Sequence, residues 1–389
     1  MKFLFAADMS FNYMPEFPGI DAVNTAMSEV KGYFEEADFS IVNLENVLGI
    51  REEYTPIFKC GPNLMTTDNF INYIKALNPS VVGLSNNHTG DYGEEAIYHT
   101  LDVLDENQFP YIGAGANIEE AYKPYIAEKD GIKVGIIAVC ENEFGGAKEN
   151  KAGSSVYKLT RLKNELNKLK EENIKSVVFF HGGNERNPFP SPGKKELYRH
   201  FIDMGASAVI AMHTHCPQGY EIYNNAPIIY SMGNFFFPQE PAEGKEILPT
   251  WNYGYLTELD FKENETKIKI IPYKFDFDKI YILKGEELDQ FTEYVNYLSE
   301  VILDDKKLNE FFDAWCIKVC RFGRSSLEFN ENMIEEGNQN VAIARNKFTC
   351  EAHNELWENY YVLCYEKRHH DAEYLIEEIE ALQKLKLKK

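Results

Sequence analysis

Val209-Ile210-Ala211-Met212-His213-Thr214-His215 is the stretch of sequence that says most about the fold and the site. Its four leading apolar residues are typical of a buried strand, and that strand ends abruptly in His-x-His. Side chains two residues apart on extended backbone point to the same side, so His213 and His215 are placed to bind a common metal ion. Two histidines in a surface loop would have the same sequence. Other parts of the chain are needed to distinguish a loop from a metal site.

Four other apolar runs are also followed by polar residues of the type that binds metals. They are Lys2–Ala7, followed by Asp8; Phe39–Leu44, followed by Glu45; Ser80–Leu84, followed by Asn87 and His88; and Ser176–Phe180, followed by His181. Parallel strands bring such residues together beyond their carboxyl ends. Two carboxylates, one amide and four imidazoles therefore predict a site for one or two divalent ions, and Mn²⁺, Fe²⁺, Zn²⁺ and Mg²⁺ all suit this ligand set.

The order of the expected elements indicates an α/β protein with two mixed sheets. In the first part, strands alternate with helices, which implies parallel strands joined by crossover helices. Further along, hairpin signals such as Asp130-Gly131 mix with helices, which favours a four-layer αββα sandwich over residues 1–284. From 285 to 389 we expect a helical C-terminal extension. The expected helices are 24–37, 67–77, 92–107, 159–173, 194–204, 288–303, 308–319 and 374–387, with a polar loop at 330–340.

Charge and cysteine content restrict the partners and the compartment. The formal net charge of −22 argues against nucleic acid or an anionic membrane as a partner, and an anionic substrate would need a local cation such as a bound metal. Seven scattered cysteines favour a reducing compartment. Cys316 and Cys320 are expected in a helix core rather than in a zinc site. No apolar run approaches the roughly 18 residues of a transmembrane helix, so we expect a cytoplasmic protein.

The ordered set of motifs resembles one known family. The motifs are Asp8, Asn43-Leu44-Glu45, Asn86-Asn87-His88 with Asp91-Tyr92-Gly93, His181-Gly182-Gly183-x-Glu185, His213-x-His215 with Gln218-Gly219-x-Glu221, and Ser231-x-Gly233-Asn234-Phe235. In this order, from Met1 to about Phe237, they resemble the CapA (PgsA-like) family of capsule, or poly-γ-glutamate, biosynthesis. That family is itself similar to calcineurin-like metallophosphoesterases, which implies that the sandwich is metallophosphatase-like.

The resemblance also implies a role for each site residue. Asp8 and His215 would bind the first metal, Asn87, His181 and His213 would bind the second, and Glu45 stands at the bridging position. His88 would be the general acid, and its spacing from Asp91 suggests that Asp91 orients it. Glu185, Glu221 and Asn234 would contact the substrate, such as one bearing an amine, or hold the ligand histidines. For Glu185 and Glu221, solvated loop carboxylates remain an equal alternative.

Two departures from the phosphoesterase pattern keep the function open. Phosphoesterases usually carry Asp-x-His at the first strand, where this chain has Asp8-Met9-Ser10, and Glu45 replaces an aspartate. The first metal site is therefore poorer in ligands, and a single ion is an alternative to two. The favoured function is a metal-dependent hydrolase in the synthesis or processing of an anionic capsule polymer. The alternative is a non-catalytic, metal-containing accessory subunit with polymer-synthesis partner proteins. The bond cleaved, whether phosphoester, amide or glycosidic, is left open.

Overall fold

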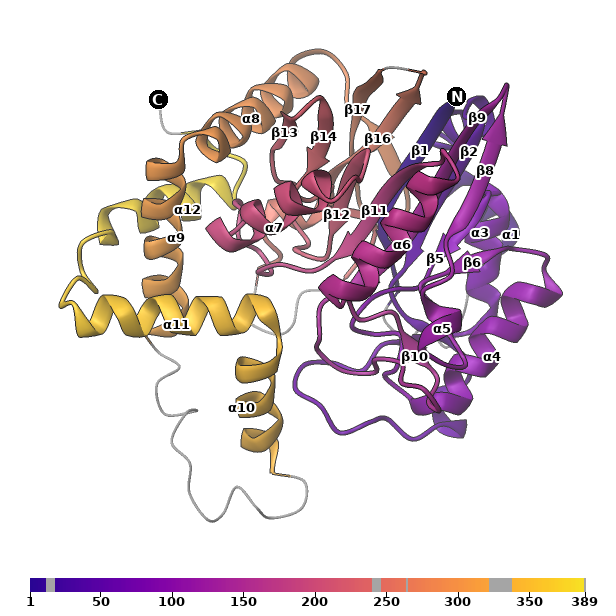
Figure 1. Ribbon diagram of the computed structural model, residues 1–389, viewed down its shortest axis with the longest axis horizontal. Coiled ribbons are helices and arrows are strands. Elements are labelled where there is room, and N and C mark those ends of the chain that lie inside the picture. Colours follow the sequence, from indigo (N-terminus) through magenta and orange to yellow (C-terminus); the bar gives the residue numbers. More distant parts are fainter. Residues whose placement is uncertain (12–17, 240–245, 264, 322–337, 388–389) are drawn as a thin grey trace.

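The computed structural model describes residues 1–11, 18–239, 246–263, 265–321 and 338–387. Two mixed sheets face each other, with helices on their outer faces and further helices beside them (Figure 1). This arrangement confirms the predicted four-layer αββα sandwich. The division into domains at residue 284 stays a prediction.

The first sheet has a parallel centre and an antiparallel edge. Its strands run in the order β18 (Ile280–Ile282), β17 (Thr266–Phe275), β16 (Tyr253–Phe261), β1 (Lys2–Met9), β2 (Phe39–Leu44), β5 (Val81–Gly83) and β6 (Tyr111–Ile112), and β15 (Asn234–Phe236) also pairs with β1. Strands β1, β2, β5 and β6 are parallel neighbours, whereas β16, β17 and β18 are antiparallel. The carboxyl ends of the parallel strands therefore meet at one edge of this sheet.

The second sheet repeats this design. Its order is β13 (Tyr220–Tyr223), β14 (Ala226–Ile229), β12 (Ala208–Met212), β11 (Lys175–His181), β9 (Ile132–Cys140) and β8 (Tyr125–Lys129). Strands β9, β11, β12 and β14 are parallel, and the predicted hairpins β8–β9 and β13–β14 close the two edges. Two further two-stranded sheets pair β3 (Val47–Leu48) with β4 (Met65–Thr66) and β7 (Ala114–Gly115) with β10 (Gly153–Ser154).

Apolar side chains fill the space between the two sheets. Phe5 of β1 lies against Phe179 of β11, with ring centroids 6.1 Å apart. Gly83 of β5 is also needed for this contact, because a Cβ there would lie 2.9 Å from the Phe179 ring. Every residue of β12 is buried, as expected for a continuous apolar strand covered on both faces.

Helices cover the outer faces of the sandwich (Figure 1). On the second sheet, α6 (Leu159–Glu171) packs on β11 and α7 (Pro192–Asp203) on β12. The remaining helices of this part are α1 (Ile20–Met27), α2 (Lys31–Glu36), α3 (Ile71–Leu77), α4 (Gly93–Glu106) and α5 (Ile118–Ala121). The single helix predicted over 24–37 is wrong, because Ser28 Oγ donates to Thr25 O and the chain turns before α2 begins.

The C-terminal part is helical, as predicted, but its helices differ from the prediction. They are α8 (Gly285–Leu303), α9 (Asp305–Cys320), α10 (Gln339–Thr349), α11 (Glu351–Tyr365) and α12 (Ile376–Leu382). Helices α10 and α11 were not predicted. The helix predicted to reach residue 387 ends at Leu382, because Leu385 adopts a positive φ of 57° and Lys386 N–H donates to Ala381 O. Most of the loop predicted at 330–340 lies outside the described residues.

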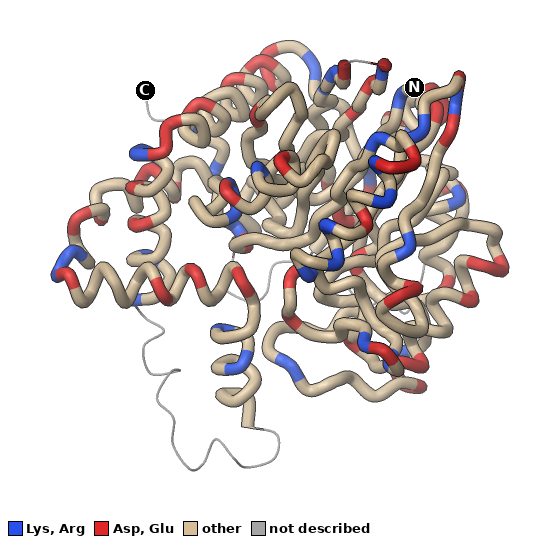
Figure 2. Tube along the Cα trace, viewed as in Figure 1, with Lys and Arg blue, Asp and Glu red and all other residues tan. Residues whose placement is uncertain are grey.

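Figure 2 shows that Asp and Glu occur along both the sandwich and the C-terminal helices, interspersed with Lys and Arg. The net charge of −22 is therefore not confined to one part of the chain. Within the described ranges, none of the helices has the length and apolar character to cross a membrane.

Candidate metal centre

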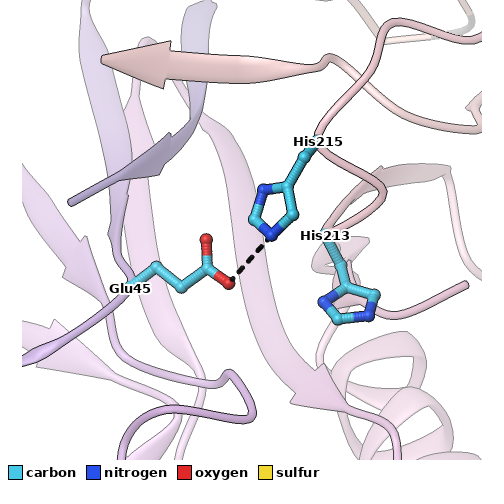
Figure 3. Close-up of side chains that lie close together, drawn as sticks. All are labelled: Glu45, His213 and His215. Carbon is cyan, nitrogen blue, oxygen red and sulfur yellow. Dashed lines mark ion pairs between the residues drawn. The ribbon is translucent and has the colours of Figure 1, made fainter. Parts of the chain in front are cut away.

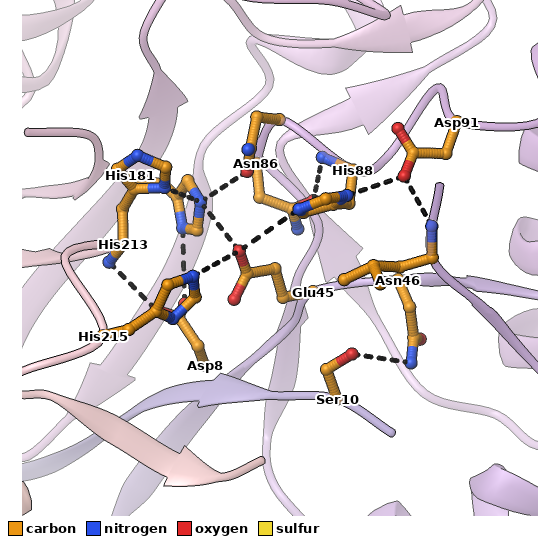
Figure 4. A network of polar contacts seen from close by, with 12 residues as sticks. Asp8, Ser10, Glu45, Asn46, Asn86, His88, Asp91, His181, His213 and His215 are labelled. Carbon is orange, nitrogen blue, oxygen red and sulfur yellow. Dashed lines mark hydrogen bonds and ion pairs between the residues drawn. The ribbon is translucent and has the colours of Figure 1, made fainter. Parts of the chain in front are cut away.

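The two sheets deliver the predicted ligand residues to one buried place (Figure 4). Asp8 lies near the end of β1, Glu45 directly follows β2, and Asn87 and His88 follow β5. From the second sheet, His181 is the last residue of β11, and His213 and His215 follow β12. All seven side chains are buried. Parallel strands thus bring together residues far apart in sequence, as predicted.

Glu45 lies at the centre of this arrangement. Its Oε1 lies 3.4 Å from His181 Nε2, 3.8 Å from His215 Nε2 and 4.0 Å from His88 Nε2. The residue is fully buried, and neither carboxylate oxygen accepts a hydrogen bond from any part of the chain that the structure describes. A buried carboxylate without hydrogen-bond donors is unfavourable. A bound cation would compensate this charge, so the residues present fit a metal ion.

Two groups of three side chains have the spacing of metal ligands. Asp8, Glu45 and His181 form one triad, and Glu45, His213 and His215 form the other (Figure 3). Within each triad the ligand atoms lie within 4.8 Å of one another. Glu45 belongs to both, as a bridging carboxylate would. The resemblance instead groups Asp8 with His215 and His181 with His213, so the partition of ligands between ions stays a prediction.

Asp8 links the two sheets at this site. Its Oδ1 accepts a hydrogen bond from Asn43 Nδ2 at 2.7 Å and lies 3.3 Å from His181 Nδ1. Its Oδ2 accepts from the backbone N–H of His213 at 2.9 Å. Burial opposes ionisation of Asp8, but the charge and hydrogen bond of His181, the charge of His215 and the hydrogen bond from Asn43 together outweigh burial and lower the pKa of the carboxyl. His213 reaches Asp8 in a left-handed conformation with φ 97°, which is rare outside glycine.

His181 and His213 lie side by side with opposite electrostatic surroundings. His181 Nε2 lies 3.0 Å from His213 Nδ1 and 2.9 Å from Asn87 Oδ1. Burial lowers the pKa of His181, but the carboxylates of Asp8 and Glu45 raise it to about 10. Burial and the charges of His181 and His215 hold the pKa of His213 well below its ordinary value. Without a metal, His181 therefore carries a positive charge beside the carboxylates of Asp8 and Glu45. A metal cation could replace that charge.

His88 is held from behind by a carboxylate and a lysine. Its Nδ1 lies 2.6 Å from Asp91 Oδ2, and Lys59 Nζ pairs with Asp91 Oδ1. Asp91 Oδ2 also accepts from the backbone N–H of Leu64 at 2.7 Å. His88 Nε2 is left facing Glu45 and the site. The predicted position of Asp91 behind His88 is therefore observed, whereas Lys59 was not predicted.

His215 is fixed by Asn234 of β15 and by Trp251, which lies just before β16. Its Nδ1 lies 2.8 Å from Asn234 Oδ1, and Asn234 Nδ2 in turn donates to Trp251 O at 3.0 Å. The Trp251 ring packs on the imidazole, with centroids 4.6 Å apart. These contacts direct His215 Nε2 towards Glu45. Asn234 thus lies where a residue that orients a ligand histidine is expected.

The two remaining predicted carboxylates lie apart from the triads. Glu221 forms a bidentate pair with Arg199, at 2.9 Å to Nε and 2.7 Å to Nη2, and accepts from Tyr230 Oη at 2.6 Å. These contacts place it away from the ligand residues. Glu185 is exposed and lies with His88 on the wall of a neighbouring cavity.

The structure adds three side chains that sequence reasoning missed. Asn43 and Lys59 contact site residues as described above, and Glu143 Oε1 lies 3.7 Å from His213 Nε2. Burial, with the charges of Glu185 and Glu141, raises the pKa of Glu143 to about 7. Asn43 stood in a quoted motif at the end of a strand, so its position was a usable signal. Lys59 and Glu143 lie in irregular segments, where no periodic pattern marks them.

Among the described residues, the cysteines of α9 belong to no group with metal-ligand spacing. Cys316 and Cys320 are buried within this helix, as predicted. Over the ranges the structure describes, the two triads are the groups with metal-ligand spacing, and neither contains a cysteine.

The fold and the site define a class of protein: a sandwich of two mixed sheets with buried carboxylate and imidazole side chains, spaced as metal ligands could be, where the two sheets meet. The chain belongs to the family described as bacterial capsule synthesis protein PGA_cap, whose model matches residues 12–239. This match confirms the resemblance inferred from the motifs.

Curated relatives each match more than half of the chain. The capsule biosynthesis protein CapA of Bacillus anthracis is 27% identical over 248 residues, covering 61% of this chain and 58% of the relative. The PGA biosynthesis protein CapA of Bacillus subtilis is 27% identical over 213 residues, covering 54% and 56%. A probable polyglutamine synthesis accessory protein of Mycobacterium tuberculosis is 24% identical over 222 residues, covering 54% and 58%. The chain spans about half the length of the curated relatives it matches.

Solved structures are similar only at a distance. The TT1561 protein of Thermus thermophilus has a TM-score of 0.36 and 11% identity, and the match covers 69% of this chain and 98% of that one. Vps29 of Chaetomium thermophilum has a TM-score of 0.27 and 9% identity, with 73% and 95% covered. These values are too low to assign a role to any residue.

Proposed function

We propose that this protein is a metal-dependent hydrolase with a phosphoesterase-type site, which acts in the synthesis or processing of an anionic capsule polymer such as poly-γ-glutamate. The observation that carries the proposal is the Glu45 carboxylate, which is fully buried, unpartnered by hydrogen bonds within the described residues, and shared by two ligand triads. Membership of the capsule synthesis family and the names of the Bacillus relatives support the polymer. Seven free cysteines support a reducing, cytoplasmic location.

In this proposal the chain holds one or two divalent ions. Six residues would hold the metal: Asp8, Glu45, Asn87, His181, His213 and His215. A divalent ion bound there supplies Lewis acidity, which lowers the pKa of water and stabilises negative charge that develops in the transition state. Asn43 and Asn234 would keep Asp8 and His215 in place through their hydrogen bonds.

His88 would donate a proton to the leaving group from Nε2. Asp91 accepts a hydrogen bond from His88 Nδ1, which fixes the orientation of the imidazole ring. The ion pair with Lys59 holds the Asp91 carboxylate in turn. This places the free nitrogen of His88 on the side of Glu45, where the substrate would lie. Histidine is the side chain that most often transfers protons in catalysis, which suits His88 to this role.

The test combines metal content with turnover. We expect purified protein to retain divalent metal, measured by mass spectrometry, and to hydrolyse 4-nitrophenyl phosphate with Mn²⁺. His88→Ala should lower kcat by about a hundredfold or more, the usual contribution of a general acid. His99→Ala is the matched control, because His99 pairs with Asp68 outside the site. Protein that binds no metal under any condition would refute the proposal.

A second function is favoured by one observation, the poor ligand set near the first strand. Ser10 stands where phosphoesterases usually carry a histidine, and its Oγ accepts from Asn46 Nδ2 at 3.2 Å instead of joining a triad. The mycobacterial relative is named an accessory protein. A metal-containing accessory subunit would bind metal without turnover and would tolerate His88→Ala. The reverse pattern would exclude this function.

A further inference from the structure

The ring of His213 places its two nitrogens in different surroundings. Its Nδ1 lies 3.0 Å from His181 Nε2, and Figure 3 shows one ring nitrogen of His213 on the side of Glu45 and the other turned away. His213 Nε2 lies 3.7 Å from Glu143 Oε1. A histidine that binds a metal almost always donates its second ring N–H to a carboxylate, a carbonyl or a water, which fixes the tautomer and the ring orientation. Glu143 therefore lies where such an acceptor is expected.

Strand β9 delivers Glu143 to this position. It pairs with β11 in parallel, so that Cys140 lies opposite His181, and Glu143 follows Cys140 in the loop beyond the strand. Glu143 is buried. Its distance from His213 exceeds the usual length of a hydrogen bond by about 0.5 Å and lies within the range of an ion pair. Glu143 is thus a further carboxylate at the carboxyl end of a parallel strand, beside a ligand but outside both triads.

Helix α10 holds Glu143 from the other side. Asn346 Nδ2 donates to Glu143 Oε2 at 3.4 Å, and Arg345 Nη1 donates to the backbone carbonyl of Glu143 at 2.9 Å. The Arg345 guanidinium also lies over the ring of Phe144, 4.8 Å from its centroid. Helix α10 lies outside the range matched by the family model, residues 12–239. The carboxylate beside His213 is therefore held by a part of the chain that the family match does not include.

We propose that Glu143 is a positioning residue of the metal centre. It accepts a hydrogen bond from His213 Nε2, which leaves His213 Nδ1 as the nitrogen that binds the ion, and α10 keeps Glu143 in place. Such an acceptor also makes the ligand imidazole more basic, which strengthens its hold on a cation. The inference rests on the proposed function in requiring a bound metal, but it does not depend on turnover. It gives a C-terminal helix a role in setting the metal affinity.

The experiment measures the Kd of the full chain for Mn²⁺ by calorimetry at pH 8. Burial, with the charges of Glu185 and Glu141, raises the pKa of Glu143 to about 7, so its carboxylate is ionised at this pH. We expect Glu143→Leu to raise the Kd by about ten- to a hundredfold, as loss of an acceptor behind a ligand histidine typically does. Glu143→Gln should raise it by less than about tenfold, because the amide oxygen still accepts from His213 Nε2.

Asn346→Leu tests the contribution of α10. It removes the donor to Glu143 Oε2 and should raise the Kd by about two- to tenfold, the effect of losing one hydrogen bond. Asn340→Leu is the matched control, since Asn340 is an exposed asparagine on the same helix, and it should leave the Kd unchanged. Glu165→Leu controls for the loss of one negative charge, because Glu165 pairs with Lys168 on α6. Thermal unfolding of the metal-free variants checks that each is folded.

A second measurement separates a positioning residue from a ligand. The visible absorption spectrum of the Co²⁺-loaded protein reports the coordination geometry of the ion. We expect Glu143→Gln to keep the wild-type spectrum, because the ligand set is unchanged. A changed spectrum, or an equal rise of the Kd in the Gln and Leu variants, would indicate a direct ligand and overturn the inference.

The inference and the proposed function fail separately. A wild-type Kd in Glu143→Leu, or an equal rise of the Kd in Glu165→Leu, would overturn the inference even in an active hydrolase. An unchanged Kd in Asn346→Leu would overturn the role of α10. A Kd that depends on Glu143 in a protein that hydrolyses nothing would refute the hydrolase and leave the positioning role standing. Protein that binds no metal would overturn both.

Discussion

Glu45 illustrates how a single residue reveals the chemistry of this site. Its carboxylate is buried among imidazoles, and neither oxygen accepts a hydrogen bond within the described residues. Each neighbouring histidine has its other ring nitrogen near a fixed partner, as His215 has with Asn234 and His88 with Asp91. The free nitrogens and the carboxylate therefore converge on the space where an ion would sit.

We expect Mn²⁺ to stabilise the wild-type protein and not Glu45→Gln. At about 100 times its Kd, a ligand that binds only the folded state stabilises it by about 2.7 kcal/mol. Thermal unfolding with and without Mn²⁺ measures this as a shift of Tm. Glu221→Gln is the control, because Glu221 is also buried but pairs with Arg199 away from the triads. An equal shift in Glu45→Gln would show that Glu45 is not a ligand.

Lys59 allows a second prediction at this scale. It is buried and pairs with the buried Asp91, so Lys59→Met leaves a carboxylate without its cation. We expect a loss of about 3 kcal/mol or more in the free energy of unfolding, measured by urea denaturation. Lys168→Met removes an exposed pair with Glu165 and should change stability by less than about 0.5 kcal/mol. Similar small effects of both substitutions would contradict the assigned role of the Lys59 pair.

The residues at strand ends were predictable, and the residues behind them were not. Asp8, Glu45, His181 and His213 follow apolar runs that the sequence displays directly, so their convergence follows from parallel strands. Lys59 comes from an irregular segment, and only the folded chain brings it to Asp91. The strand patterns therefore predict which residues gather, whereas the contacts that orient them depend on tertiary structure.

At the scale of elements, the turn that carries His88 is pressed against a neighbouring loop. A Cβ at Gly90 would lie 2.4 Å from the Cα of Gly145, which is backbone and cannot move aside easily. Gly145 itself adopts a positive φ of 72°. Two glycines are thus needed for the close approach of these loops beside the candidate site.

We expect Gly90→Ala to destabilise the protein by about 1–3 kcal/mol, as overpacking does, and to reduce turnover by displacing His88. Gly32→Ala provides the matched control. Gly32 lies in α2, and a Cβ at this position would meet nothing within 4 Å, so alanine there should stabilise the helix by roughly 0.5–1 kcal/mol. Urea denaturation gives both values. Equal effects would show that the two loops separate without cost.

A buried carboxylate helps to join helix α11 to the site. Glu141 Oε1 accepts from the backbone N–H of Ala352, and its Oε2 accepts from that of Gly183, two residues after His181. Buried Lys194 pairs with the same carboxylate. Neither α10 nor α11 was predicted, because exposed aromatic residues, among them Phe348 at 71% and Tyr365 at 89% exposure, obscure the helical pattern.

At the scale of the whole molecule, one hydrophobic core extends from the sandwich into the C-terminal helices. Phe189, next to α7, packs on Phe311 of α9 with ring centroids 4.5 Å apart. Ser299 of α8 accepts a hydrogen bond from the backbone N–H of Tyr220 in β13. The proposed division at residue 284 therefore crosses a packed interface rather than a linker.

We expect residues 1–284 and 285–389 to unfold together. Trp251 reports on the sandwich, while Trp315 and Trp357 report on the C-terminal helices. Urea transitions followed by tryptophan fluorescence and by circular dichroism should coincide. Phenylalanine replacements of single tryptophans assign the fluorescence to each part. Two separate transitions would show that the proposed domains are independently stable.

The candidate site spans the seam of the sandwich, because Asp8 and Glu45 belong to one sheet and His181 and His213 to the other. An ion bound to both sets would resist sliding of the sheets past each other. Loss of the ion would then make the whole interface between the two sheets more flexible, and the effect would extend beyond the few atoms that had coordinated it. Metal supply would in that way govern the stiffness of the molecule as well as its chemistry.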